Sequence, residues 1–136
     1  MSWLPPPRRL LASKLGAVPS KQEHITKAEG NAALATSLPL DTQARIDWAL
    51  IMLFYAAMHY IEAYLATLGQ HLRSHTTRDA FVGRDPNLKT IYAEYRDLKF
   101  YGYTARYEVY AFQAEDVTNH AAKHFATIKA NLQSLL

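Results

Sequence analysis

The sequence contains no cysteine, which excludes a disulfide framework, a cysteine nucleophile, a thiolate zinc site and an iron–sulfur cluster. Glycine and proline are scarce, at five and six of 136 residues, and three of the prolines are consecutive, at positions 5–7. A turn-rich all-β fold is therefore not expected. Charged residues make up 20% and apolar residues 49% of the chain, and this balance excludes disorder over most of its length.

Long apolar runs are also missing. The longest uncharged apolar run, residues 48–58, has eleven residues, whereas a membrane span needs about 20. The first ten residues carry the proline run and the pair Arg8-Arg9 where a signal peptide would have an apolar stretch. Together with the lack of cysteine, these features favour a cytoplasmic protein that does not contact a membrane.

Helical periodicity begins only after the prolines. We expect residues 1–19 to form an irregular arm and residues 20–136 to form a single helical domain. Ser20 and Glu23 have the spacing of a capping box, in which each residue satisfies a free N–H group of the other. They predict the start of a first helix, which Pro39 would end.

A second helix is expected over residues 41–68, with Gly69 as its stop. Its middle is apolar on every face, which is typical of the central helix of a bundle. A polar connection follows. Thr76, three residues before an acidic side chain, predicts a cap for a short helix over residues 77–82, and Gly83 would end that helix.

The remaining helices follow in the second half of the chain. Asp85-Pro86 predicts the start of a fourth helix, residues 101–103 should interrupt it, and Thr104 would cap a further turn. A last helix is expected over residues 113–135. The predicted fold is an all-α, up-and-down bundle of four to five helices. The expected inner face of the last helix consists of Val117, Ala121, His124, Ile128 and Leu135.

One stretch of the chain has a distinctive residue order. Residues 54–65 read FYAAMH and then YIEAYL. After them come His71, Ser74-His75, Arg78, Tyr92, Tyr95-Arg96, Leu98 and Ala105-Arg106-Tyr107. In this order the residues from 48 to 107 resemble small bacterial members of the HEPN (higher eukaryote and prokaryote nucleotide-binding) superfamily.

The resemblance implies a helical bundle that forms a homodimer, binds RNA or a nucleotide and needs no cofactor. Many HEPN proteins are metal-independent ribonucleases of toxin or defence systems, so a protein partner such as an antitoxin is also implied. Their cleavage motif is an arginine followed, after four to six residues, by a histidine. No arginine in this chain has a histidine at that spacing, which leaves a divergent nuclease, a binding-only domain or an adaptor bundle.

The first candidate site lies in the basic middle of the chain, where residues 71–106 contain seven basic and four acidic side chains. Two imidazoles can act as general base and acid near neutral pH, and an arginine can stabilise a phosphorane. His71 and His75 would exchange protons with the RNA, and Arg78 or Arg106 would stabilise the charge. The alternative is an ordinary polar loop between helices.

Aromatic side chains alternate with basic ones in the same part of the chain, and such a pattern can stack nucleobases and neutralise phosphates. Tyr92 and Tyr95 lie on an apolar helical face and are expected in the core instead. The candidate binding residues are Arg73, Arg96, Lys99, Tyr101, Tyr103 and Tyr107.

A metal site is a further alternative. Asp116, His120 and His124 are spaced i, i+4, i+8 and would share one helical face. His59 and Glu62, spaced i, i+3, could contribute from the central helix. Against this reading, the chain lacks the paired Glu-x-x-His repeats of di-iron bundles, and His124 falls on the apolar stripe of its helix.

Overall fold

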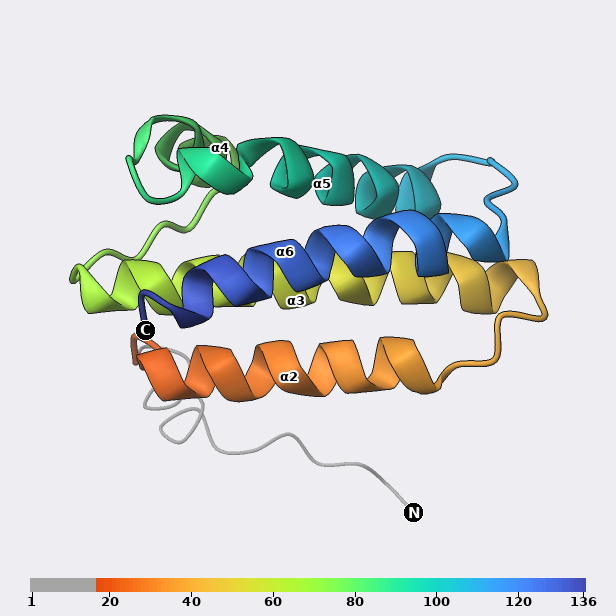
Figure 1. Cartoon of the computed structure of the whole chain (residues 1–136), viewed down its shortest axis with the longest axis horizontal. Coiled ribbons are helices and arrows are strands. Elements are labelled where there is room, and N and C mark those ends of the chain that lie inside the picture. Colours follow the sequence, from red (N-terminus) through yellow and green to blue (C-terminus); the bar gives the residue numbers. More distant parts are fainter. Residues whose placement is uncertain (1–16) are drawn as a thin grey trace, which may run out of the picture.

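The computed structural model describes residues 17–136, so most of the predicted arm lies outside the described residues. Within residues 17–136 every regular element is a helix, which confirms the predicted all-α bundle. Figure 1 shows the long helices side by side, each antiparallel to the long helix before it, with a short helix at one end. The elements are α2 (Lys21–Ser37), α3 (Gln43–Thr67), α4 (His75–Arg84), the 3₁₀ turn η1 (Lys89–Ile91), α5 (Tyr92–Tyr107), the π-helical segment η2 (Asp116–Ala121) and α6 (Ala122–Gln133).

Helix α3 is the central element and packs against α2, α5 and α6. It is long and apolar enough to cross a membrane, with a mean hydropathy of 1.4 over 18 residues. However, 72% of that window is buried by the other helices, as in the core helix of a soluble protein. The bundle therefore shields the most apolar segment of the chain from solvent.

The ends of α2 and α3 follow the predicted signals. The Ser20 hydroxyl accepts a hydrogen bond from the Glu23 amide, and the Glu23 carboxylate accepts one from the Ser20 amide, both at 3.1 Å. Thr42 caps α3 by accepting from the Arg45 amide at 3.2 Å. Gly69 has a φ of 68°, the left-handed conformation that glycine adopts most readily after a helix.

The predicted limits of α4 are wrong at both ends. Its cap is Ser74, whose hydroxyl accepts from the Thr77 amide at 3.1 Å, and not Thr76, which lies within the helix. Gly83 does not end the helix, which continues to Arg84. A glycine stops a helix when it adopts a positive φ, and Gly83 does not adopt one.

A turn replaces the predicted start of the fourth helix. The Asp85 carboxylate accepts from the amides of Asn87 and Leu88 at 2.9 and 3.1 Å. This is the local bonding that favours a turn over a helix. The chain passes through the 3₁₀ turn and enters α5 at Tyr92.

The predicted break at residues 101–103 is also wrong, because α5 runs without interruption to Tyr107. Gly102 is buried within this helix, and a Cβ atom placed on it would lie 2.9 Å from the Phe54 Cβ of α3. Gly102 therefore allows two helices to approach closely. Thr104, expected as a cap, lies inside α5.

The last helix contains a π-helical segment that the periodicity did not indicate. A π-turn adds one residue to a helical turn and shifts the faces that follow. Val117, Ala121 and Ile128 are buried as predicted, whereas Phe125 and Leu132 are buried in place of His124 and Leu135. His124 is 28% exposed at its side chain and pairs with Asp97, with 3.5 Å between Nε2 and Oδ2.

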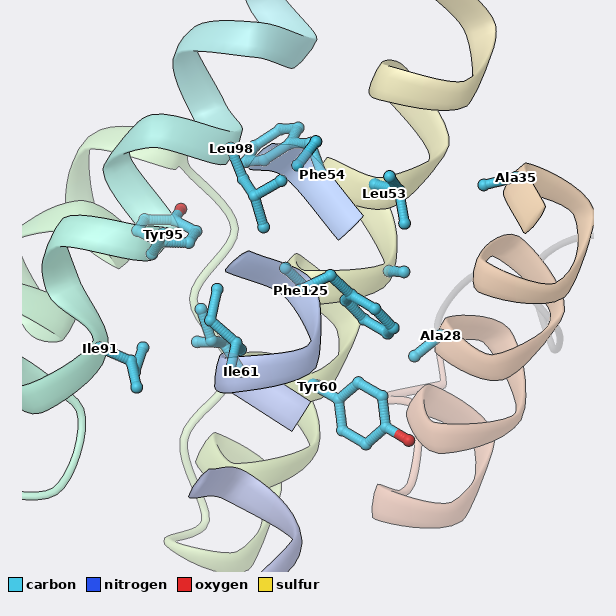
Figure 2. Close-up of a cluster of buried hydrophobic side chains, with 14 of the residues drawn as sticks. Ala28, Ala35, Leu53, Phe54, Tyr60, Ile61, Ile91, Tyr95, Leu98 and Phe125 are labelled. Carbon is cyan, nitrogen blue, oxygen red and sulfur yellow. The ribbon is translucent and has the colours of Figure 1, made fainter. Parts of the chain in front are cut away.

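The core lies between α3 and the helices around it. Figure 2 shows Phe54 and Ile61 of α3 facing Leu98 and Tyr95 of α5, and Phe125 of α6 lying over Tyr60. The Tyr60 side chain extends toward α2 in the same view, and its hydroxyl donates to a Glu29 carboxylate oxygen. The bundle thus buries most of the apolar surface of α3, and the side that carries Trp48 stays partly exposed.

Candidate functional site

A cavity of about 290 Å³ opens between α3, α5 and the first turn of α4. This volume is near the lower limit for small-molecule sites, about 300–1,000 Å³. The lining contains aromatic and basic side chains and no acidic one. It consists of Phe54, Tyr55, His75, Lys99, Gly102, Tyr103, Arg106 and Tyr107. We refer to this site as the cleft.

Arg106 provides the free positive charge of the cleft. Its Nη1 donates to the Tyr55 hydroxyl, and its guanidinium lies 5.2 Å from the centre of the Tyr107 ring. Among residues 17–136 it has no acidic partner within 4.0 Å. An arginine oriented by neutral groups keeps its donors and its charge for an anionic ligand.

Lys99 also lines the cleft, but its charge is balanced. Its ammonium group pairs with Asp79 Oδ2, and Asp79 Oδ1 accepts from the Tyr95 hydroxyl at 2.8 Å. Burial, followed by that contact with Asp79, raises the pKa of Tyr95 well above its usual range. Tyr95 therefore remains a hydrogen-bond donor that orients Asp79.

His75 is the one histidine in the cleft lining. Its Nδ1 lies 3.1 Å from Arg78 Nη1. Arginine only donates hydrogen bonds, so we assign the proton of neutral His75 to Nε2. Burial, followed by the charges of Arg78 and Lys99, lowers the pKa of His75 below its ordinary value.

Arg78, a predicted catalytic residue, is buried beside the cleft and does not line it. Its Nε donates to Glu62 Oε1 at 2.6 Å, and the side chains of this ion pair are 7% and 4% exposed. Its Nη2 donates to the Leu72 carbonyl at 3.3 Å. With its third contact to His75, Arg78 connects α3, α4 and the loop between them, which is a positioning role.

His71, the other predicted proton carrier, belongs to a different cluster. One ring nitrogen of His71, one of His24 and one carboxylate oxygen of Glu62 lie within 4.8 Å of one another. His71 and His75 thus occupy the two ends of a series of contacts through Glu62 and Arg78. His24 was not predicted as a site residue, and it lies on the same buried face of α2 as Ala28.

His24 and His59 contact each other directly, with 3.1 Å between their Nδ1 atoms. Burial, and then the neighbouring His24, lowers the pKa of His59 to about 4. Burial also lowers the pKa of His24, and the Glu62 carboxylate acts in the opposite direction. Both rings are therefore neutral at physiological pH, and one Nδ1 carries the proton of their hydrogen bond.

The predicted binding residues divide between the cleft and other surfaces. Lys99, Tyr103 and Tyr107 line it, and the rings of the two tyrosines lie 5.0 Å apart. Tyr101 packs on Phe112 outside the cleft, with 5.4 Å between ring centres. Arg96 lies 5.9 Å from the centre of the Tyr92 ring, and Arg73 is exposed on the loop before α4.

The predicted metal ligands of the last helix do not come together. Asp116 Oδ2 accepts from the Gln113 amide at 2.7 Å, His120 is exposed on the π-helical segment, and His124 faces Asp97. In the part of the chain that the structure describes, His24, Glu62 and His71 form the one group of at least three potential ligands within 4.8 Å.

The chain matches no protein-family model, no curated protein and no solved structure. The HEPN resemblance therefore stays a prediction, and the function must be inferred from the geometry of the two clusters. The cleft offers stacking surfaces and positive charge without acidic groups, which suits an anionic ligand that contains a planar ring.

Proposed function

We propose that the cleft binds a nucleotide unit of single-stranded RNA. The observation that carries the proposal is the lining itself, in which aromatic rings surround the unpaired charge of Arg106. Tyr103 and Tyr107 would offer a ring face to the base, and Arg106 would bind the phosphate. The cavity of about 290 Å³ has room for one base and its phosphate, so the rest of an RNA strand would lie outside.

The proposal is for binding and does not extend to cleavage by one chain. The two-histidine reaction expected from the sequence needs two imidazoles at one phosphate, and His75 is the one histidine that lines the cleft. A homodimer, which the HEPN resemblance implies, could supply the second group from a partner subunit. A ribonuclease activity, an antitoxin partner and a cytoplasmic location remain predictions from the sequence.

Fluorescence anisotropy with a 5′-labelled oligouridylate tests the proposal. We expect Arg106→Gln to weaken binding by about 10-fold to 100-fold, because a hydrogen bond to a charged group contributes about 1.5–3 kcal/mol. Arg96→Gln is the matched control. It removes the same charge from α5, at an exposed side chain that does not line the cleft. Absence of binding by the wild type, or equal losses in both variants, would refute the proposal.

The second candidate function is an adaptor bundle that binds another protein. The observation in its favour is an exposed apolar surface where α2 meets α3. Leu34 and Trp48 are 53% and 58% exposed there, beside a groove that also includes Leu38 and Met52. Exposed apolar groups that gather in one place are typical of interaction surfaces. If Trp48→Ser weakens RNA binding, this surface takes part in the function of the cleft. If RNA binding is unchanged, the surface and the cleft act independently.

A further inference from the structure

Three separate segments meet at one end of the bundle. His24 lies in the first turns of α2, Glu62 in the last turns of α3, and His71 in the loop that follows α3. Figure 1 shows the start of α2 and the end of α3 at the same end of the molecule, beside the C-terminus. One ring nitrogen from each histidine and one carboxylate oxygen approach within 4.8 Å of one another.

Glu62 is the strongest indication that this cluster binds something. The residue is 3% exposed, and its Oε1 is bonded to Arg78. Its Oε2 is buried without a hydrogen-bond partner among the described residues. A buried carboxylate oxygen that has lost its water is unfavourable unless another group satisfies it, and a cation between the histidines and Glu62 would do so.

The arrangement around the three ligands is that of a supported metal site. Arg78 orients the carboxylate by donating to its other oxygen, Oε1, and His59 bonds to Nδ1 of His24. If His24 donates that hydrogen bond, its Nε2 carries a lone pair, which is the tautomer that binds metal through Nε2. Such supporting contacts orient the ligands of natural metal sites.

His71 is the ligand of the cluster whose side chain can move most easily. It is exposed and lies in the connection between the end of α3 at Thr67 and the start of α4 at His75. Around tetrahedral Zn²⁺, bonds of about 2.0–2.1 Å place the ligand atoms about 3.4 Å apart. The ligand atoms lie within 4.8 Å of one another, so their separations exceed this value by about 1.4 Å at most, and His71, on an exposed loop, is the ligand with the most freedom to move.

We propose that His24, Glu62 and His71 bind one Zn²⁺ ion per chain and that the ion fixes the loop after α3 to the start of α2. Two imidazoles and one carboxylate are a known ligand set for Zn²⁺, with water at the fourth position. Of the metal ligands that the sequence indicated, this site includes Glu62 of the central helix but none of the three on the last helix. It does not depend on RNA binding in the cleft.

Zinc titration of the full chain, with any affinity tag removed and the protein treated with a chelator beforehand, tests the proposal. Competition with a chromophoric chelator would give the stoichiometry and the affinity. We expect one equivalent for the wild type and binding at least about 100-fold weaker for His71→Ala, since removing even a supporting group lowers metal affinity by about 10-fold to 100-fold. His71 is exposed, so its removal should leave the fold intact.

His120→Ala is the matched control. It removes an exposed histidine from the π-helical segment and should leave zinc binding unchanged. A second measurement is the melting temperature, which Zn²⁺ should raise in the wild type and in His120→Ala but not in His71→Ala. Less than half an equivalent of bound zinc in the wild type, or equal affinity in His71→Ala, would overturn the proposal.

Discussion

The cleft and the cluster of His24, Glu62 and His71 are connected by one buried ion pair, between Arg78 and Glu62. The two sites favour ligands of opposite charge. The cleft has an unpaired guanidinium, aromatic rings and no acidic lining. The cluster has two imidazoles and a carboxylate oxygen that has no hydrogen-bond partner among residues 17–136. The first suits an anion and the second a cation. Arg78 links the two sites, because it bonds to Glu62 of the cluster and to His75 of the cleft.

Removing Arg78 should have the largest effect, because both regions depend on it. We expect Arg78→Met to lower the free energy of unfolding by about 3–5 kcal/mol, the usual result of leaving one charge of a buried ion pair without its partner. Urea denaturation in the presence of a chelator measures this loss without any contribution from bound metal. A loss below about 1 kcal/mol would show that Glu62 is less isolated from solvent than its 3% exposure indicates.

The double variant Glu62→Leu/Arg78→Met separates charge from packing. Replacing both members of a buried ion pair by apolar groups is often neutral or stabilising. We therefore expect the double variant to be more stable than Arg78→Met alone. If both have the same stability, the loss in the single variant comes from the contacts of Arg78 to Leu72 and His75 and not from an isolated charge.

The fold was predicted from local signals. Some of the errors are local, such as the cap of α4 and the turn at Asp85, and others arise from tertiary contacts. The capping box at Ser20 and the stop at Gly69 depend on neighbouring residues, and both are present. Gly102 looked like a helix breaker because its close contact with Phe54, 48 positions earlier, cannot be seen in the sequence. The π-turn before α6 has no local signature in the composition of its residues, and of the inner face predicted for the last helix Val117, Ala121 and Ile128 are buried, whereas His124 and Leu135 are not.

The candidate site was also predicted only in part, because some of its contacts join residues far apart in the sequence. His75, Arg106, Lys99, Tyr103 and Tyr107 do line one cavity, because they lie on elements whose order the sequence indicated. The role of Arg78 depends on its long-range partner. His24 was missed because its partners Glu62 and His71 are 38 and 47 positions away. A polar residue on the otherwise apolar face of α2 was the available signal.

The next largest effect concerns pH and the cleft. The pKa of His75 is lowered, so the ring is neutral at pH 7.5 and gains its charge only below its ordinary range. The protonated ring attracts phosphate, and affinity for oligouridylate should therefore rise once pH falls below the ordinary histidine range, by about 10-fold when the ring is fully charged, for one added charge-assisted contact. Phosphodiesters do not titrate in this range.

His75→Gln is the control for this pH dependence. It keeps a polar side chain at the first position of α4 but cannot become charged, so its affinity should vary less with pH than that of the wild type. Identical pH profiles for the two proteins, measured by anisotropy at fixed salt, would place the titrating group outside the cleft and remove His75 from the binding site.

A smaller effect on stability is expected from Gly102→Ala, at a residue that lines the cleft. The added Cβ would lie 2.9 Å from Phe54 Cβ and 3.0 Å from Phe54 Cδ2, so the two helices must move apart. Overpacking of this kind costs about 1–3 kcal/mol, and the higher helix propensity of alanine returns about 1 kcal/mol. We expect a net loss of about 1 kcal/mol in the free energy of unfolding, measured by urea denaturation, together with weaker RNA binding.

The smallest change in the free energy of unfolding, and one of opposite sign, is expected from Gly30→Ala on α2. Gly30 also lies inside a helix, but apart from the backbone of its own helix no atom of residues 17–136 lies within 4 Å of the position that its Cβ would occupy. The substitution should therefore stabilise the protein by about 0.5–1 kcal/mol through helix propensity alone, and urea denaturation measures this gain on the same scale as the loss at Gly102. Because the chemical change is identical at both sites, the two values isolate the contact between α3 and α5. If both variants gain stability, the helices that form the floor of the cleft are free to separate, and the cavity between them is not a fixed binding site.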